Sequence, residues 1–377
     1  MKAEPRVPDE ALAAIRAPFA EAGAEAVDPP ILQPLGALLD LAGEALRARL
    51  FIVQAEGGAE ACLRPDFTVP VARLHLERGA GEGRYYYEGR AFRAAPEQSG
   101  RAEEFLQIGL ELYSPADAPV IEADAEIAAL AWATALAGGR EDLALWLGDV
   151  ALFSAFVDSL GLAGPLADRL KRAAARPRLL QAELARAGAV EAPVQGGQLA
   201  ATLAALPPDA AAALLEEVWS LAGVERVGGR GAAEIAQRLV SRAEAARAPA
   251  LTETQAEAIR RFLAIDAAPA EALVQLSELG GADPAFAAAL DGWRARLARL
   301  AAAGVPAAAI RFAAGLGHTF DYYDGLTFEV RSAALGAGRP VAVGGRYDGL
   351  SARLGGPSAR AVGAMARPWR AFAGGEA

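Results

Sequence analysis

Residues 105–113 read FLQIGLELY, and this regular alternation of apolar and polar side chains predicts a β-strand. Successive side chains of a strand point to opposite faces, and the apolar ones here share a face that belongs against a core: Leu106, Ile108, Leu110 and Leu112. Gln107, Gly109 and Glu111 share the other face, where Gly109 leaves space between two polar groups. Two interpretations of this second face remain open, namely contact with solvent or the wall of a polar binding site.

A partner for this strand precedes it in the chain. Residues 85–93 also have strand character, and the polar loop 94–103 connects them to residues 104–113, which predicts an antiparallel hairpin with a long tip. Further strands are expected at 50–54, 144–150, 309–314, 322–331, 340–343 and 361–365. In the alanine-rich middle of the chain, helices are expected at 166–188, 197–205, 209–222, 231–247, 252–265, 268–279 and 284–303.

The order of these elements indicates an α+β fold. Strands dominate the beginning and the end of the chain, whereas helices dominate its middle. We therefore expect a discontinuous core made of residues 1–160 and 305–377. The alanine-rich residues 161–304 are expected to form a mostly helical insertion.

Composition excludes several classes of protein. The chain has 377 residues, of which 53% are hydrophobic. Its single cysteine excludes a disulfide framework. One cysteine and two histidines could form a zinc site only together with several carboxylates. The net charge of −10 argues against a nucleic-acid partner, because phosphate backbones are bound mainly by Lys and Arg. The N-terminal residues lack the apolar core of a signal peptide, and no apolar run reaches the ~18 residues of a membrane span. We expect a cytoplasmic protein that contacts no membrane.

Polar residues of other segments complete the inventory of an amino-acid pocket. Asp66 and Thr68 follow Arg64-Pro65, Arg93 ends the first strand of the hairpin, and Tyr322 and Tyr323 begin a strand near the end of the chain. These side chains offer acceptors for an ammonium group and a cation for a carboxylate, and both charged ends of an amino acid must be paired once water is removed.

Several segments resemble the motifs of class II aminoacyl-tRNA synthetases, specifically of the histidyl type. The resemblance to motif 2 lies in three segments, LRPDFT (63–68), FR (92–93) and FLQIGLE (105–111). FDYY (320–323), TFEV (327–330) and GGRYDGL (344–350) resemble the two histidine-specific motifs, and AVG (361–363) resembles the start of motif 3. Residues 27–33 are a weaker likeness to motif 1, the dimer-interface element. The resemblance implies a class II synthetase-like antiparallel sheet flanked by helices.

Departures from the synthetase pattern concern mainly the part that binds ATP. His318 stands where the synthetase has an arginine, which removes a permanently charged contact for the carboxylate and the reacting phosphate. Arg93-Ala94-Ala95-Pro96 replaces Arg-His-Glu-Arg of the synthetase, and Arg367-Pro368-Trp369-Arg370 lacks the usual Gly and Glu surroundings of motif 3. The chain also stops at Ala377, without the synthetase's anticodon-binding domain. We expect the ATP half of the site to be lost and the amino-acid half to be mostly kept.

This combination resembles the regulatory subunits of ATP phosphoribosyltransferase. The resemblance implies a subunit without catalysis or cofactor of its own, which the short-form catalytic subunit requires for activity in the first step of histidine biosynthesis. It also implies allosteric feedback inhibition by histidine, self-association as a class II-type dimer, and assembly with catalytic subunits into a hetero-octamer.

The resemblance assigns roles to individual residues of a histidine pocket. Asp66, Thr68 and Gln107 are expected to hold the ammonium group. Glu111 and Tyr323 are expected to hydrogen-bond the imidazole nitrogens, while Arg93 meets the carboxylate. The remaining expected members of the pocket are His318, Tyr322 and the three residues that would close its floor, Gly344, Gly345 and Arg346.

Two other functions remain open at this point. The chain could be an ATP-dependent amino-acid-activating enzyme related to histidyl-tRNA synthetase, or a scaffold that has lost its ligand. Histidine-dependent exchange between ATP and pyrophosphate would distinguish the enzyme from the regulatory subunit.

Overall fold

The computed structural model describes residues 2–42, 44–54, 58, 60–79, 81–96, 98–174, 177–188, 202, 206–221, 250–316 and 322–375. The chain divides into two compact units. The first unit comprises Met1–Ser159 and Arg261–Ala377, and the second comprises Leu160–Arg260. All residues expected in the binding site belong to the first unit.

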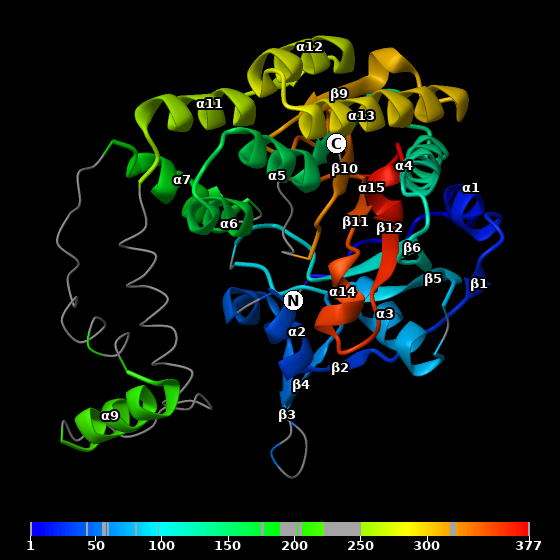
Figure 1. The fold of residues 1–377 in the computed structure, drawn as a ribbon. Coiled ribbons are helices and arrows are strands. Elements are labelled where there is room, and N and C mark those ends of the chain that lie inside the picture. The colour runs from blue at the N-terminus through cyan, green and yellow to red at the C-terminus, as the bar shows by residue number, and fades with distance from the viewer. Residues whose placement is uncertain are drawn as a thin grey trace. The chain divides into compact units, whose positions relative to one another are not determined.

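A nine-stranded sheet forms the centre of the first unit (Figure 1). Its strands are, in spatial order, β1 (Glu25–Ala26), β5 (Gly83–Phe92), β6 (Glu104–Pro115), β12 (Ala359–Ala366), β11 (Ala342–Arg346), β10 (Leu326–Ser332), β7 (Leu143–Asp149), β9 (Ile310–Ala313) and β8 (Asp266–Ala267). Only the pairings of β1 with β5 and of β7 with β9 are parallel. The expected α+β fold is confirmed, and so is the hairpin, in which β5 pairs with β6.

β6 lies inside the sheet between β5 and β12, and both of its faces are buried. Residues directly opposite each other on neighbouring strands point to the same face, so Glu111 shares its face with Tyr85 of β5 and Gly363 of β12. We call this the polar face of the sheet. Gln107 and Glu111 on it are at most 1% exposed, which excludes the interpretation that this face contacts solvent.

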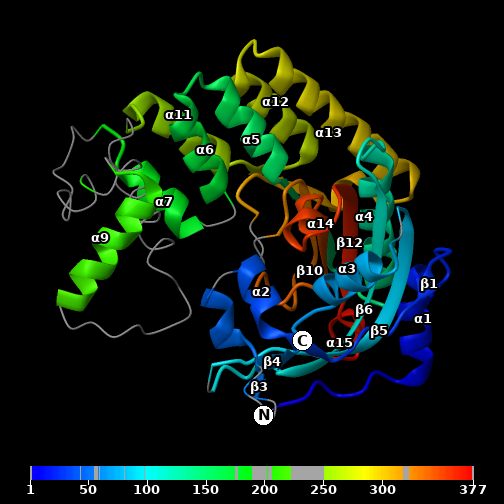
Figure 2. The same ribbon diagram turned by 60° about the horizontal axis from the view of Figure 1, so that its bottom comes forward.

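Helices cover the face opposite to the polar face. α4 (Ile121–Leu136) packs against β10, β11 and β12, and α1 (Asp9–Ala20) and α13 (Pro284–Ala302) pack in turn on α4 (Figures 1 and 2). Asp124 of α4 is fully buried and accepts hydrogen bonds from Arg296 of α13 at 2.8 Å and from Arg346 of β11 at 2.7 Å. The two guanidinium groups offset the cost of burying this carboxylate and fix α4 between the sheet and α13.

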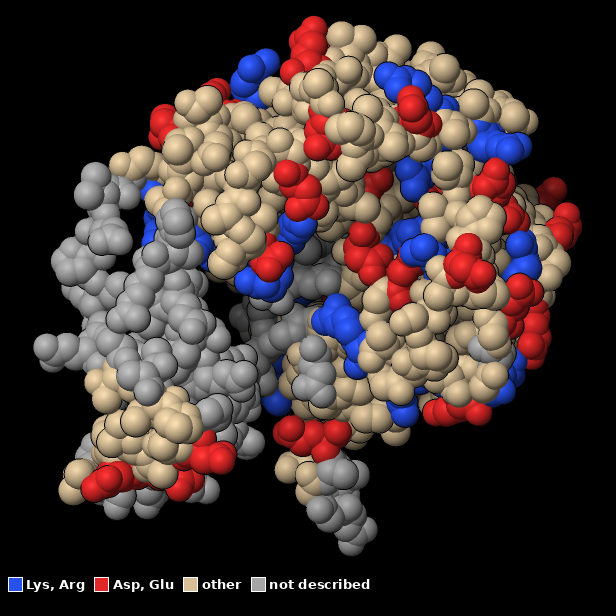
Figure 3. Space-filling model, in the orientation of Figure 1, with Lys and Arg blue, Asp and Glu red and all other residues tan. Residues whose placement is uncertain are grey.

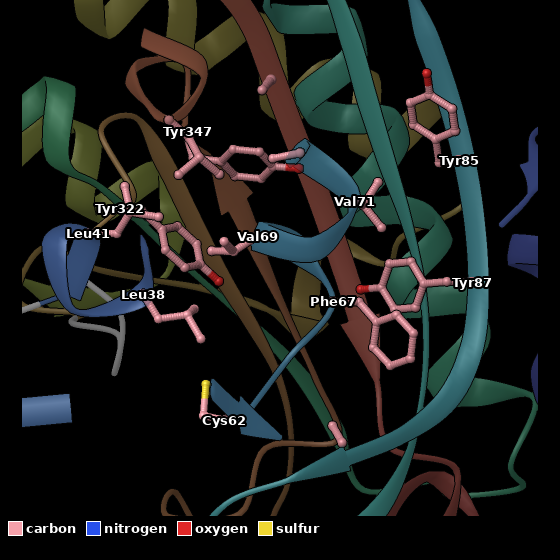
Figure 4. Packing of buried hydrophobic residues seen from close by; sticks show 14 of the residues in the cluster. Leu38, Leu41, Cys62, Phe67, Val69, Val71, Tyr85, Tyr87, Tyr322 and Tyr347 are labelled. Carbon is pink, nitrogen blue, oxygen red and sulfur yellow. The ribbon is translucent and has the colours of Figure 1, made fainter. Parts of the chain in front are cut away.

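The polar face is covered by α3 (Thr68–Glu77) and α14 (Gly349–Arg353), and the residues before α3 form a smaller sheet. That sheet has the order β2 (Leu32–Pro34), β4 (Glu60–Leu63) and β3 (Ile52–Gln54), with α2 (Leu35–Ala42) and the 3-10 helix η1 (Glu44–Arg49) between β2 and β3. Figure 4 shows the apolar packing in this region, where the Phe67 ring stacks on Tyr87 with centroids 4.4 Å apart. This packing fixes the backbone of residues 66–68, which enter the candidate site.

Three further helices complete the first unit: α5 (Val150–Ser159), α12 (Pro269–Gly280) and α15 (Pro368–Ala371). The second unit contains α6 (Gly164–Ala173), α7 (Pro177–Ala185), α9 (Pro208–Leu221) and most of α11 (Glu253–Leu263). An ion pair of 3.0 Å between Arg169 and Glu183 joins α6 to α7. The helix expected at 231–247 lies outside the described residues, as does all of the one expected at 197–205 except residue 202.

The second unit is shorter than the expected insertion, which extended to residue 304. Residues 261–304 belong to the first unit because α13 packs on α4 and α5. Trp293 of α13 donates a hydrogen bond of 2.8 Å to the buried carboxylate of Asp149, at the end of β7. Alanine-rich composition therefore continues from the second unit into helices of the first.

Among the described residues, none of the helices is long and apolar enough to cross a membrane. The same residues include no group of three or more His, Cys, Asp or Glu placed to hold a metal ion. On the face drawn in Figure 3, basic and acidic side chains intermingle over the first unit.

Candidate functional site

A cavity of about 650 Å³ opens on the polar face of the central sheet. Six residues expected in the pocket line it: Asp66, Thr68, Arg93, Gln107, Tyr322 and Tyr323. They come from the turn before α3, the end of β5, the middle of β6 and the segment before β10. The structure therefore brings together segments that are more than 250 residues apart in the sequence, such as Asp66 and Tyr322, whose hydroxyl donates to Asp66 Oδ2 at 3.3 Å.

Two acceptor atoms in the cavity wall are buried and have no hydrogen-bond partner among the described residues, Asp66 Oδ1 and Gln107 Oε1. The Gln107 amide nitrogen is oriented by the Tyr87 hydroxyl at 3.4 Å. Burial raises the pKa of Asp66, and the charge of Arg93 opposes this shift. A cation with several N–H donors would pair both oxygens and stabilise the ionised carboxylate, so this part of the cavity fits an ammonium group.

Glu111 is close to the cavity but does not line it. Its Oε1 accepts hydrogen bonds from Thr68 at 2.9 Å and from Tyr87 at 3.3 Å, and its Oε2 accepts one from the Tyr347 hydroxyl. Burial raises the pKa of Glu111 to about 8, although these donors oppose the shift. Three hydroxyl groups hydrogen-bond the Glu111 oxygens, and Thr68 connects Glu111 to the cavity.

Gly344 and Gly345 do not line the cavity either, but Gly345 supports its wall. A β-carbon on Gly345 would lie 2.7 Å from the Tyr323 ring, so the absence of a side chain allows Tyr323 to pack against β11. A β-carbon on Gly344 would overlap the Phe328 ring instead. The two glycines thus permit close packing of aromatic rings rather than contact with a ligand.

Arg346 differs from its expected role at the pocket floor. Arg346 of β11 pairs with Val362 of β12, and Val362 pairs with Leu112 of β6. Leu112 follows Glu111 in the strand and points to the opposite face, so Arg346 also points away from the polar face. Its guanidinium pairs with Asp124 and, at 2.8 Å, with Asp348. Arg346 therefore holds α4 on the sheet.

Arg93 occupies the cavity wall as expected for a carboxylate contact. Its Nε donates to the Pro65 carbonyl at 2.7 Å, and its guanidinium lies 5.3 Å from the centre of the Phe105 ring. These contacts orient the side chain in the cavity wall. His318, the last expected member of the pocket, lies outside the described residues.

The structure adds lining residues that sequence analysis did not assign to the site. Four are arginines, Arg49, Arg101, Arg367 and Arg370, and one is an acid, Glu329 of β10. Arg367 and Arg370 belong to the segment compared with motif 3, so the resemblance offered a signal for them. Arg49, at the end of η1, and Arg101, in the loop between β5 and β6, follow no local pattern.

Comparison with known proteins identifies the family. The histidyl-tRNA synthetase family profile matches residues 3–227 and 225–368. The ATP phosphoribosyltransferase regulatory subunit of Mesorhizobium japonicum is 38% identical over 348 residues, which cover 90% of each chain. The protein of the same name from Rhizobium johnstonii is 36% identical over 351 residues, again covering 90% of each chain.

Solved structures show the same fold. An ATP phosphoribosyltransferase regulatory subunit/histidyl-tRNA synthetase from Bacillus halodurans superimposes with a TM-score of 0.64 at 20% identity, covering 99% of this chain and 82% of its own. A histidyl-tRNA synthetase from Nostoc sp. PCC 7120 superimposes with a TM-score of 0.61 at 16% identity, covering 96% of this chain and 69% of its own. The chain therefore belongs to the histidyl-tRNA synthetase family and, within it, to the ATP phosphoribosyltransferase regulatory subunits.

Proposed function

We propose that the chain is the non-catalytic regulatory subunit of an ATP phosphoribosyltransferase, which activates a short-form catalytic subunit and makes it sensitive to histidine. The names of relatives that match about nine-tenths of the chain support the regulatory role. The cavity supports the choice of an amino acid as effector, because it combines buried acceptors with a guanidinium group. Inhibition by histidine requires a coupling free energy between this cavity and the active site of the partner.

In the proposed complex, the ammonium group of histidine lies between Asp66 Oδ1 and Gln107 Oε1. Its carboxylate meets Arg93, and its imidazole meets Tyr323. Glu111 acts as a positioning residue, since it accepts hydrogen bonds from Thr68, which lines the cavity, and from Tyr87, whose hydroxyl orients Gln107. The observation that carries the assignment is the pair of buried acceptors that have no hydrogen-bond partner in the described part of the chain, which a bound ammonium would satisfy.

We further propose that the chain self-associates through the β2–β4–β3 sheet. Four large apolar residues are exposed on its two outer strands and beside them: Ile31, Leu32, Ile52 and Val53. Large apolar side chains that are exposed close together in one element are typical of an interaction surface. Two of these residues, Ile31 and Leu32, lie within residues 27–33, which resemble the dimer-interface motif of class II synthetases. This resemblance supports a second copy of the chain as the binding partner of this surface.

The activity of the catalytic subunit tests the regulatory role. Phosphoribosyl-ATP formation from ATP and phosphoribosyl pyrophosphate is measured with the cognate short-form catalytic subunit, alone and with this chain. The proposal predicts a large rate increase on addition of the chain and its suppression by histidine. No rate increase, in a mixture shown to contain both folded proteins, would contradict the proposal. If the chain alone catalysed histidine-dependent exchange between ATP and pyrophosphate, its function would instead be that of an amino-acid-activating enzyme.

A further inference from the structure

The hydroxyl group of Tyr87 joins the two polar residues of β6. Gln107 Nε2 donates a hydrogen bond to it at 3.4 Å, and it donates one to Glu111 Oε1 at 3.3 Å. Tyr87 is opposite Gly109 in the pairing of β5 with β6, and a β-carbon on Gly109 would overlap the Tyr87 hydroxyl. The space that Gly109 leaves between Gln107 and Glu111 is therefore filled by this hydroxyl, which reaches both neighbours.

Packing holds the Tyr87 side chain in this position. It is fully buried, and its ring stacks on Phe67 with an angle of 4° between the two planes (Figure 4). Phe67 directly precedes Thr68, whose hydroxyl donates to the same oxygen of Glu111 at 2.9 Å. Tyr87 is not among the residues that line the cavity. It therefore acts on a ligand through the residues that it hydrogen-bonds.

A tyrosine hydroxyl has a single proton, so the direction of one of its hydrogen bonds fixes the direction of the other. An ionised Glu111 can only accept, and Tyr87 therefore donates to it. When Glu111 is protonated, its proton can reside on Oε2 beside the Tyr347 hydroxyl, and Oε1 still accepts from Tyr87 and Thr68. The Tyr87 oxygen must then accept from Gln107, which places Nε2 on this side of the amide. Gln107 Oε1 is consequently directed to the cavity that Gln107 lines.

We propose that Tyr87 is a positioning residue that turns the Gln107 amide oxygen toward the cavity and thereby makes the site select ligands with an amino group. An amide turned the other way would present N–H groups to the ammonium group of a ligand, and two donors do not pair. It would also bring Gln107 Oε1 against the Tyr87 oxygen, whose proton is engaged by Glu111. This inference rests on the proposed histidine site and names the residue behind its preference for an amino acid.

Replacement of Tyr87 by Phe removes the hydroxyl and keeps the ring that stacks on Phe67. Histidine can then bind only with Gln107 Nε2 buried and unpaired, which weakens its binding. Imidazolepropionate, which is histidine without the amino group, needs no acceptor at Gln107, so the amide can take either orientation. Isothermal titration calorimetry of the full chain measures both affinities. We expect Tyr87→Phe to weaken the binding of histidine about fivefold or more and to leave that of imidazolepropionate nearly unchanged.

Two further variants separate this role from a structural one. Gln107→Met keeps a side chain of similar length but has no amide to orient, so adding Tyr87→Phe to Gln107→Met should not weaken the binding of histidine further. Tyr113→Phe is the matched control, because Tyr113 is a buried tyrosine of β6 whose hydroxyl has no hydrogen-bond partner in the described part of the chain. It should leave the ratio of the two affinities at the wild-type value.

The other outcomes overturn the proposal. An equal loss of affinity for both ligands in Tyr87→Phe would show a structural role only, and so would a further loss of histidine affinity in the double variant. Unchanged histidine affinity in Tyr87→Phe would also contradict the proposal. Absence of histidine binding to the wild-type chain would instead contradict the proposed histidine site itself, so the two proposals can fail separately.

A measurement on the wild-type chain keeps the proposal testable if Tyr87→Phe does not fold. NMR of the chain labelled at its glutamine side-chain nitrogens detects the Gln107 amide, whose signal is assigned by its loss in Gln107→Met. Because Nε2 is buried and bonded to Tyr87, its protons should exchange slowly with water in the absence of any ligand. Rapid exchange of these protons would show that the amide is not held by Tyr87 and would overturn the proposal.

Discussion

At the scale of single residues, the proposed histidine site depends on the buried oxygens of Asp66 and Gln107. An unsatisfied buried acceptor costs about 1–3 kcal/mol, and more when it is charged. Asp66 Oδ1 and Gln107 Oε1 both lack a hydrogen-bond partner among the residues that the structure describes. A ligand with an ammonium group removes the deficit at both atoms, so its binding free energy should depend strongly on the charge of Asp66.

Replacement of Asp66 by Asn tests this dependence. Asn has nearly the same shape but no negative charge, and we expect histidine to bind about tenfold or more weakly, in line with about 1.5–3 kcal/mol for a hydrogen bond to a charged group. Isothermal titration calorimetry measures the affinity, with Asp291→Asn as the exposed control. Unchanged affinity in Asp66→Asn would show that the ammonium group lies elsewhere.

Glu111 should make stability depend on pH. Its pKa is raised in the folded protein to about 8 from an ordinary value of 4.5, so the folded state binds the proton more tightly than the unfolded state. The resulting contribution to stability is complete below about pH 4.5 and is lost as the pH rises through about 8, with a slope of at most about 1.4 kcal/mol per pH unit.

Glu111→Gln removes this titration while keeping a neutral side chain of the same size. The difference in free energy of unfolding, wild type minus variant, should therefore decrease between pH 5 and pH 8. Urea unfolding at a series of pH values measures it. A difference that stays constant over this range would show that Glu111 is ionised in the folded protein throughout.

Strand alternation explains which residue assignments were predictable. Alternation in 105–113 predicted that Gln107 and Glu111 share a face, and the structure confirms it. The same rule separates Arg346 from Gly345, because neighbouring residues of β11 point to opposite faces. Grouping Gly344, Gly345 and Arg346 as one pocket floor ignored this rule. The hydroxyl groups that occupy Glu111 could not be predicted, since Tyr347 follows another strand more than 230 residues away.

At the scale of elements, the site depends on how closely β6, β11 and β12 pack with α3 and α14. Gly363 of β12 lies opposite Glu111, and a β-carbon there would overlap the Glu111 carboxylate and lie 2.8 Å from the Tyr347 hydroxyl. The buried cluster that connects α3 to the sheet therefore requires glycine at this position. Gly338 also lines the cavity, but a β-carbon on it would have no atom within 4 Å.

Alanine substitutions at these two glycines should differ in effect. Gly363→Ala should lower the free energy of unfolding by about 1–3 kcal/mol, the usual cost of inserting a methyl group into a packed interior. Gly338→Ala should leave it nearly unchanged. Chemical unfolding of both variants measures the difference, and an equal effect of the two substitutions would contradict the packing described for β12.

The arginines that line the cavity show what element prediction leaves out. The sequence indicated the hairpin, most strands and the helices α12 and α13, because each depends on a local period. Arg49 and Arg101 lie at the end of η1 and in a loop, and only tertiary packing brings them to one cavity. The net charge of −10 gave no sign of this local group of arginines, because it sums charges over the whole chain.

At the scale of the whole molecule, the division of the chain followed packing rather than composition. Alanine-rich sequence extends from about residue 161 to 304, but α12 and α13 belong to the first unit because buried hydrogen bonds and ion pairs connect α13 to α4 and β7. Composition reports helical propensity and cannot show which surface a helix covers. The start of the insertion was expected at 161, and the second unit begins at Leu160.

Self-association through the β2–β4–β3 sheet leads to a prediction for the assembly. Leu32, 53% exposed on β2, should be buried in the dimer, so Leu32→Asp should convert the dimer into a monomer. Val274→Asp is the control, because Val274 is 58% exposed on α12. Sedimentation velocity at micromolar concentration measures the mass. A monomeric wild type, or a dimeric Leu32→Asp variant, would contradict the proposed interface.

The most direct test of the account combines the cavity with the activity of the partner. Phosphoribosyl-ATP formation by the catalytic subunit is measured against histidine concentration, in complexes made with the wild-type chain or with Asp66→Asn. The account predicts that both chains activate the catalytic subunit equally, and that Asp66→Asn raises the half-inhibitory histidine concentration about tenfold or more. Equal inhibition of the two complexes would show that histidine acts at another site and would contradict the account.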